Sequence, residues 1–353
     1  MAYNGLSDSN VDHYEQLSTP EQLKLKFPLT ERAWNTVYQS RESIKLIIDG
    51  KDCRKIIVVG PCSIHNIDEA KEYAQKLSET AAKVKDKLVV VMRTYFEKPR
   101  TVLGWKGLVP DPRLNGSADM ELGRSSAREL LLYINELGLP AATEPVSTRN
   151  IQCYDHLISY ACIGARTTEA QTHRELASGL TMPVGFKNST TGDVTIAIDA
   201  LLSAREPHQF DGMQSNGSEA IVYTKGNKYG FIVLRGSNGG PNYQPDQVRE
   251  IETKIKSRGL KPRMIIDCNH GNSGKNFQFQ PVVFRDVIKQ IRTGSPSLMG
   301  LMIESNLKEG KQNLPQDLIG FDHSKLEYGL SVTDSCLGWE ETQNLILEAY
   351  CNL

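Results

Sequence analysis

The sequence predicts an α/β protein: a closed (β/α)8 TIM barrel with an N-terminal extension and an inserted β-hairpin. Short runs of β-branched and aliphatic residues recur along the chain, and each closes on Gly, Pro or a polar residue. Amphipathic, helix-like stretches such as 69–83, 127–137 and 247–257 separate most of these runs. Alternating strands and helices favour a parallel sheet, and eight such units favour its closure into a barrel. The eight expected strands are residues 56–59, 88–92, 141–143, 162–165, 184–186, 231–234, 264–266 and 298–303.

Two segments exceed a minimal barrel. Residues 1–50 precede the first strand and form an extension that we expect to serve oligomer contacts or regulation. Residues 51–353 form the expected catalytic barrel, and a hairpin at about 208–227 is inserted before its sixth strand. An open doubly wound sheet is the alternative, although no Gly-x-Gly-x-x-Gly motif follows the first strand.

Composition excludes several classes of protein. The 353 residues carry a net charge of −1, which provides neither a basic footprint for nucleic acid nor a polybasic surface for membranes. No apolar run is long enough to span a bilayer, and residues 1–10 lack the apolar core of a signal peptide. The seven cysteines are scattered without a Cys-x-x-Cys pair, which argues against a disulfide framework. We therefore expect a cytoplasmic protein.

Positive charge gathers at the ends of the expected strands. Barrel active sites lie at the carboxyl ends of the strands, so side chains there share one face. A single Arg or Lys would be an ordinary solvated charge, but six on one face of a nearly neutral protein indicate anionic ligands, since packed cations repel. These cations are Arg93, Lys98, Arg100, Arg166, Lys187 and Arg235.

A second group combines sulfur, nitrogen and oxygen donors. Cys62, His270 and Glu304 follow the first, seventh and eighth expected strands, which are neighbours in a closed barrel. A thiolate, an imidazole and a carboxylate suit one divalent metal ion, either Mn, Fe, Co or Zn. Asp334, in a polar loop after the last strand, is a candidate fourth ligand. A buried cysteine beside unrelated polar residues would explain the same spacing.

Longer motifs around these residues resemble the type I 3-deoxy-D-arabino-heptulosonate 7-phosphate (DAHP) synthases. The similarity runs from about Phe27 to Trp339 and includes the extension and the hairpin. Its motifs, in order, are residues 59–65 (VGPCSIH), 92–101 (MRTYFEKPRT), 104–107 (GWKG), 163–169 (IGARTTE) and 183–188 (PVGFKN).

The resemblance implies an activity and two substrates. The family condenses phosphoenolpyruvate with erythrose 4-phosphate in the first step of the shikimate pathway, which leads to the aromatic amino acids. It also implies a homodimer or homotetramer. A related synthase acting on another, possibly aminated, aldose phosphate is one alternative. A catalytically retired regulatory barrel is another, although the retained metal ligands and cations argue against it.

The resemblance also assigns roles to individual residues. By matching motif, the metal ligands would be Cys62, His270, Glu304 and Asp334. The phosphoenolpyruvate site would comprise Arg93, Lys98, Arg166, Lys187 and Arg235, and the aldose phosphate site Arg100 and Thr101. Lys98 and Glu144 are candidates for handling the proton of the water that adds during the reaction. Together with two of the metal ligands, they make up the expected catalytic residues: Lys98, Glu144, His270 and Asp334.

Three segments depart from the family pattern. The family commonly has serine directly before the histidine ligand, where this chain has Asn269. Residues 144–147 read Glu-Pro-Val-Ser instead of Glu-Phe/Met-Leu-Asp, and residues 213–217 replace a familiar hairpin motif. In relatives, these last two segments and residues 178–181 build the cavity for an aromatic amino-acid inhibitor. We therefore predict a weak or altered response to aromatic amino acids.

Overall fold

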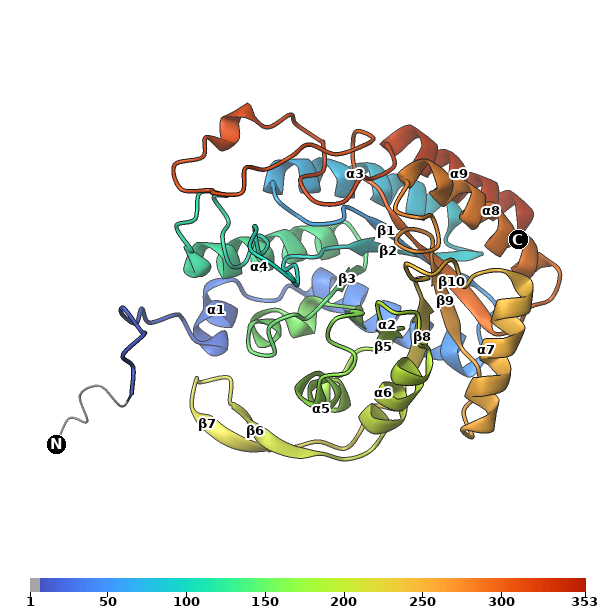
Figure 1. The fold of residues 1–353 in the computed structure, drawn as a ribbon, viewed down its shortest axis with the longest axis horizontal. Coiled ribbons are helices and arrows are strands. Elements are labelled where there is room, and N and C mark those ends of the chain that lie inside the picture. The colour runs from blue at the N-terminus through green and yellow to red at the C-terminus, as the bar shows by residue number, and fades with distance from the viewer. Residues whose placement is uncertain (1–6) are drawn as a thin grey trace.

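The computed structural model describes residues 7–353, so residues 1–6 of the predicted extension lie outside it. Eight parallel strands close into a barrel in the order β1-β10-β9-β8-β5-β4-β3-β2 (Figure 1). The predicted barrel is confirmed, and the alternative of an open sheet is wrong. The strands are β1 (Lys55–Gly60), β2 (Leu88–Arg93), β3 (Ala141–Thr143), β4 (Tyr160–Ile163), β5 (Val184–Lys187), β8 (Gly230–Leu234), β9 (Met264–Asp267) and β10 (Leu298–Glu304).

Helices cover the outside of the barrel (Figure 1). Several begin at a side chain that caps free backbone N–H groups; Asn66, for example, accepts from the amides of Asp68 and Glu69. The helices are α1 (Pro20–Lys26), α2 (Glu31–Asp49), α3 (Ile67–Val84), α4 (Met120–Glu136), α5 (Gln171–Gly179), α6 (Thr195–Arg205), α7 (Pro245–Ser257), α8 (Gln280–Arg292) and α9 (Trp339–Asn352), with short 3-10 turns at Asn150–Cys153, Asp155–Leu157, Phe277–Phe279 and His323–Lys325.

Strand side chains divide into two layers. Ile57 and Val59 of β1 belong to the cluster shared with the surrounding helices, whereas Ile56 and Val58 belong to the cluster inside the barrel. Val89 and Val91 of β2 lie in that same inner cluster. Successive side chains of a strand point to opposite faces, so every second residue of each strand faces the barrel axis.

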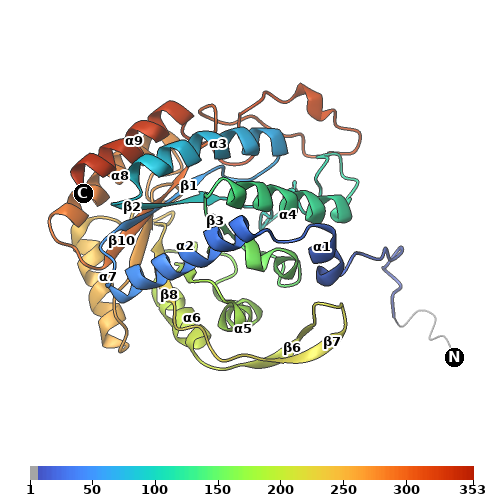
Figure 2. The same cartoon turned by 180° about the vertical axis from the view of Figure 1, so that it is seen from behind.

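Helix α2 closes the amino-terminal end of the barrel. Figure 2 shows it lying across the barrel strands. Its Ile44, Ile47 and Ile48 are buried in the inner cluster with the inward-facing strand residues. Arg263, directly before β9, donates from Nε to the carbonyl of Ile48 at 2.7 Å, which satisfies a free carbonyl at the end of the helix. The extension thus has a structural role that the sequence-based prediction did not include.

The inserted hairpin is confirmed. β6 (Gln209–Met213) and β7 (Glu219–Tyr223) pair antiparallel as a separate two-stranded sheet. Its turn reaches α1, because the amide of Glu21 donates to the carbonyl of Ser215 at 2.8 Å. Within residues 7–353, no helix is long and apolar enough to cross a membrane.

One strand boundary was predicted two residues too late. The sequence indicated residues 162–165, whereas β4 is Tyr160–Ile163. The strand ends at Ile163 because the carbonyl of the next residue, Gly164, accepts hydrogen bonds from the amides of Thr167 and Thr168, which begins a turn. Tyr160 stacks on Phe231 inside the barrel, a contact that its polar hydroxyl did not suggest.

Gly300 of β10 should be indispensable for stability. A Cβ atom there would overlap the backbone of Ile56 on the neighbouring strand β1, where neither partner can yield. We expect Gly300→Ala to lower the free energy of unfolding by about 3 kcal/mol or to prevent folding. Gly239→Ala, on an open loop, is the matched control and should be nearly neutral. Urea denaturation checks both, and equal midpoints would contradict the strand-packing argument.

Candidate active site

Four charged residues stand at the last inward-facing position of their strands. Arg93 ends β2, Lys187 ends β5, Asp267 ends β9 and Glu304 ends β10. Arg93, Asp267 and Glu304 each lie two residues beyond a residue of the inner cluster, and Lys187 directly follows a residue of the outer cluster. All four are buried. The period of two therefore turns all four into the top layer of the barrel interior.

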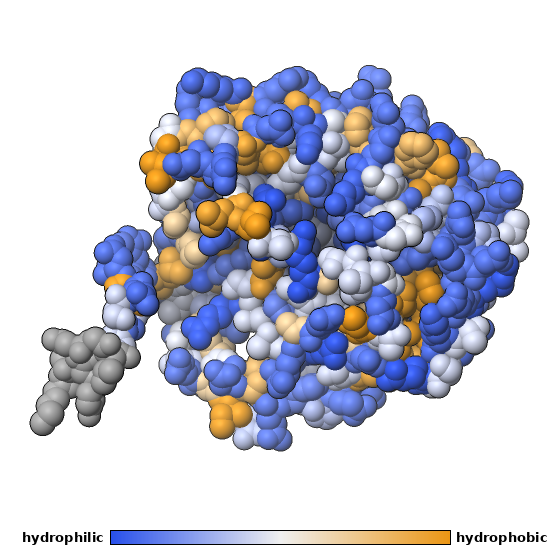
Figure 3. Space-filling model, viewed as in Figure 1, coloured by the Kyte–Doolittle hydropathy of each residue, from blue (hydrophilic) through white to orange (hydrophobic). Residues whose placement is uncertain are grey.

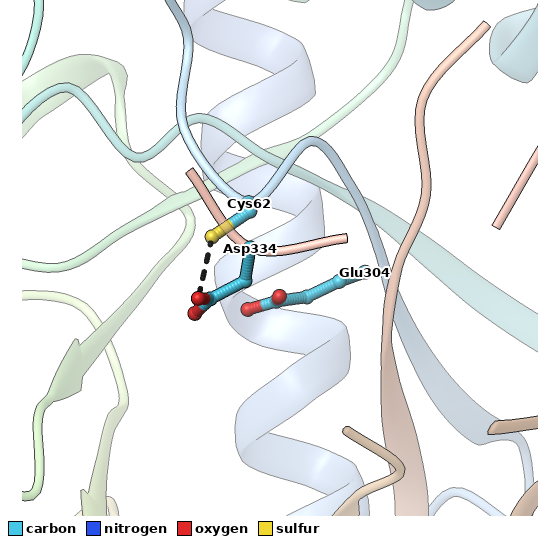
Figure 4. A group of neighbouring side chains, drawn as sticks. All are labelled: Cys62, Glu304 and Asp334. Carbon is cyan, nitrogen blue, oxygen red and sulfur yellow. Dashed lines mark hydrogen bonds between the residues drawn. The ribbon is translucent and has the colours of Figure 1, made fainter. Parts of the chain in front are cut away.

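Cys62, Glu304 and Asp334 form a compact group at this layer (Figure 4). One ligand atom from each lies within 4.8 Å of the others, and the Cys62 thiol is 3.8 Å from Asp334 Oδ2. Burial, aided by the negative charge of Glu304, raises the pKa of Cys62 to about 11, although Lys98 Nζ lies 3.2 Å from the sulfur and opposes this. A bound cation would therefore have to displace the thiol proton.

The Glu304 carboxylate is held on both oxygens. Arg93 Nη2 donates to Oε1 at 3.0 Å, and Asn269 Nδ2 donates to Oε2 at 2.6 Å. Burial alone would raise the pKa of Glu304, but the positive charges of Arg93, His270 and Lys98 outweigh burial and hold it at about 2. Glu304 is therefore an anion at neutral pH.

His270 lies beside the compact group. Its Nε2 is 3.9 Å from Glu304 Oε1, and its Nδ1 is 3.0 Å from Asp267 Oδ2. The residue has a positive φ of 55°, an unusual backbone conformation for a side chain of this size. The structure thus brings Cys62, Glu304 and Asp334 together, with His270 at the edge of the group.

Asp267 received no role from the sequence, yet it connects two of the predicted residues. Its Oδ2 accepts from Lys187 Nζ at 2.7 Å and faces His270 Nδ1. Burial would raise the pKa of Asp267, but His270 and Lys187 hold it well below the usual value. The signal that could have identified Asp267 is its position at a strand end, three residues before the histidine.

A cavity of about 480 Å³ lies above this layer. A hollow bordered mainly by hydrophilic residues opens on the face drawn in Figure 3. Arg93 lies beneath the cavity, fully buried, whereas Arg100 and Thr101 lie exposed at its rim. The predicted residues that line the cavity are Lys98, Arg100, Thr101, Glu144, Arg166, Lys187, Arg235, His270 and Asp334, and Lys275 adds a cation that sequence reasoning missed.

Glu144 reaches the cavity because its neighbour is a glycine. A Cβ atom on Gly164 would overlap the Glu144 carboxylate, so the absence of a side chain directly after the adjacent strand β4 leaves the space that this carboxylate occupies. Glu144 is mostly buried and lines the same cavity as Lys98 and Arg166.

Comparison with known proteins identifies the family of the chain. Residues 27–347 match the DAHP synthetase I family. The chain belongs to the DAHP synthetase I family. It is 46% identical over 353 residues to the Tyr-sensitive phospho-2-dehydro-3-deoxyheptonate aldolase of Escherichia coli (strain K12), covering 100% of this chain and 98% of that one.

Two further proteins are similar to this chain over almost its whole length. The Trp-sensitive phospho-2-dehydro-3-deoxyheptonate aldolase of Escherichia coli (strain K12) is 45% identical over 97% of both chains. The solved structure of phospho-2-dehydro-3-deoxyheptonate aldolase from Francisella tularensis SCHU S4 superimposes with a TM-score of 0.92 at 42% identity, covering 97% of this chain and 98% of that one.

Removing Arg93 should destabilise the protein through Glu304. Arg93→Met leaves a buried carboxylate without the guanidinium that pairs with it, so we expect the free energy of unfolding to fall by about 3–5 kcal/mol. Lys254→Met breaks the exposed pair with Glu250 and should cost less than about 1 kcal/mol. Denaturation of metal-stripped protein measures both. Equal losses would show that burial of the Arg93–Glu304 pair carries no special cost.

Proposed function

We propose that the protein condenses phosphoenolpyruvate with erythrose 4-phosphate and water to give DAHP and phosphate, the first step of the shikimate pathway. Membership of the DAHP synthetase I family and relatives that match the whole chain support this reaction. The observation that carries the proposal is the proximity of two features: a group of metal-ligand side chains and a cavity lined by cations.

We assign one divalent cation to Cys62, Glu304 and Asp334, with His270 as the fourth ligand. The donor set supports this, because a thiol, carboxylates and an imidazole together suit Mn, Fe, Co or Zn. When bound, the cation would supply a Lewis acid that polarises the aldehyde oxygen of the aldose.

The cations arrange the two substrates by depth. Arg93, Lys187 and Arg235 are buried and Lys98 is half-buried. We assign these four to phosphoenolpyruvate, together with the exposed Arg166, which lines the same cavity. Arg100 and Thr101 are exposed at the rim, where they would bind the aldose phosphate. Placing two anions side by side against their repulsion is largely an orientation effect.

Proton transfer falls to Glu144 in this proposal. Burial would lower the pKa of Lys98, but the neighbouring acidic groups of Cys62, Glu304 and Glu144 outweigh burial and raise it, so Lys98 stays protonated and can donate. The Glu144 carboxylate lines the same cavity and can accept the proton of the water that attacks C2 of phosphoenolpyruvate.

Consumption of phosphoenolpyruvate with erythrose 4-phosphate tests the function. We expect turnover to vanish after EDTA treatment and to return with Mn²⁺, because Cys62, Glu304 and Asp334 would again hold a cation. Cys62→Ala, which removes the sulfur ligand, should fail to recover activity on adding Mn²⁺. Lack of turnover by folded, metal-bound wild type would instead indicate another aldose phosphate.

A second cavity supports a regulatory site for aromatic amino acids. It measures about 840 Å³ and is lined by residues of two of the segments that the resemblance associates with the inhibitor, 178–181 and 213–217. Residues 148–152, directly after the third segment, complete the lining. Relatives named Tyr-sensitive and Trp-sensitive share 45–46% identity with this chain. Because two of the segments depart from the family pattern, we propose that the response is weak or altered. The lining includes Thr148, Arg149, Ile151, Gln152, Leu176, Gly179, Leu180 and residues 210–216.

We also propose that the chain assembles as a homodimer or homotetramer. Ile221 and Tyr223 on β7 are 64% and 69% exposed, and side chains of this kind are often covered in an assembly.

Inhibition assays test the regulatory proposal. Phe, Tyr and Trp at sub-millimolar concentrations should each leave most of the activity of wild type. Ser147→Asp restores the acidic residue that the family pattern has at this position, and it should strengthen inhibition by at least one of the three. Strong inhibition of the unmodified protein by any of them would contradict the prediction.

A further inference from the structure

Asn269 makes a contact that the serine expected at this position could not make. It is 3% exposed, and its Nδ2 donates to Glu304 Oε2 at 2.6 Å. Its Oδ1 accepts from the hydroxyl of Ser273 at 3.0 Å, and its backbone amide donates to Asp267 Oδ1 at 3.0 Å. Side chain and backbone are thus held by three partners.

Chemistry decides the orientation of the Asn269 amide. The ionised Glu304 carboxylate only accepts hydrogen bonds, so the atom 2.6 Å from it must be the NH₂ group. A flipped amide would place two oxygens against each other. The hydroxyl of Ser273 can donate to the amide oxygen on the other side, which stabilises the same orientation.

Asn269 and Arg93 together restrain the Glu304 carboxylate. Arg93 holds Oε1 and Asn269 holds Oε2, so rotation about the Cγ–Cδ bond would break a hydrogen bond. The amide nitrogen of Asn lies two bonds from Cβ, whereas the hydroxyl of Ser lies one bond from it. A serine on this backbone would therefore leave Oε2 without the donor that it has here.

We propose that Asn269 is a positioning residue for Glu304, which tunes the affinity and geometry of the divalent-cation site at Cys62, Glu304 and Asp334. The inference rests on the metal site proposed above. Hydrogen bonds to the ligands of a metal commonly change its affinity by about 10- to 100-fold when they are removed. Here the hydrogen bond comes from a residue that departs from the family pattern.

Titration of metal-stripped protein with Mn²⁺, followed by the electron paramagnetic resonance of free Mn²⁺, tests the proposal. Asn269→Ser and Asn269→Leu should each raise the dissociation constant by about tenfold or more, since both remove the donor. Ser273→Ala, which only loosens the amide, should raise it less. Cys268→Ala is the control, because Cys268 is buried next to Asn269 but makes no hydrogen bond to Glu304. The Mn²⁺ affinity of this variant should match that of wild type.

Two further measurements separate positioning from general stability. The melting temperature of the metal-stripped variants reports packing, and the visible absorption of bound Co²⁺ reports ligand geometry. A changed Co²⁺ spectrum in Asn269→Leu supports the proposal. An unchanged dissociation constant in both Asn269 variants, with or without a lower melting temperature, overturns it. Failure of wild type to bind Mn²⁺ would overturn the metal site itself, whereas Mn²⁺ binding without turnover would count against only the proposed reaction.

Discussion

The alternation of side chains along a strand, enforced in a closed barrel, is the constraint from which the site follows. Inward positions low in the barrel hold apolar residues such as Val58 and Val91, which pack against each other and against α2. The same period, continued to the carboxyl ends, turns Arg93 and Glu304 inward above them. A shift of one residue in any of these strands would turn its charged end residue outward, toward the helices, and would turn an apolar residue inward.

Collecting ionised groups in an interior is costly, and the structure meets the cost by pairing. Arg93 pairs with Glu304, and Lys187 pairs with Asp267, in both cases with almost no exposure to solvent. Removing one partner of such a pair costs more than the pair contributes, because the remaining charge stays buried. The cations around the cavity rim have fewer fixed acidic partners, so their charge is available to anionic substrates.

The sequence predicted the parts of this arrangement that depend on local pattern. Strand runs were visible because buried parallel strands are continuously apolar, and motif residues such as Cys62 and Lys98 could be placed at strand ends. Contacts between distant segments were not visible. Nothing local indicates that α2 plugs the barrel, that Asp267 joins Lys187 to His270, or that Asn269 reaches Glu304, since each depends on how strands far apart in sequence meet in space.

Closure of the amino-terminal end by α2 also determines how substrates enter and products leave. With Ile44, Ile47 and Ile48 filling the amino-terminal end, molecules approach the interior from the opposite mouth. A ligand bound at the depth of Lys187 therefore lies below a ligand bound at Arg100 on the rim. In the proposed reaction, phosphoenolpyruvate would therefore bind before the aldose phosphate. The product would leave through the same opening by which both substrates enter.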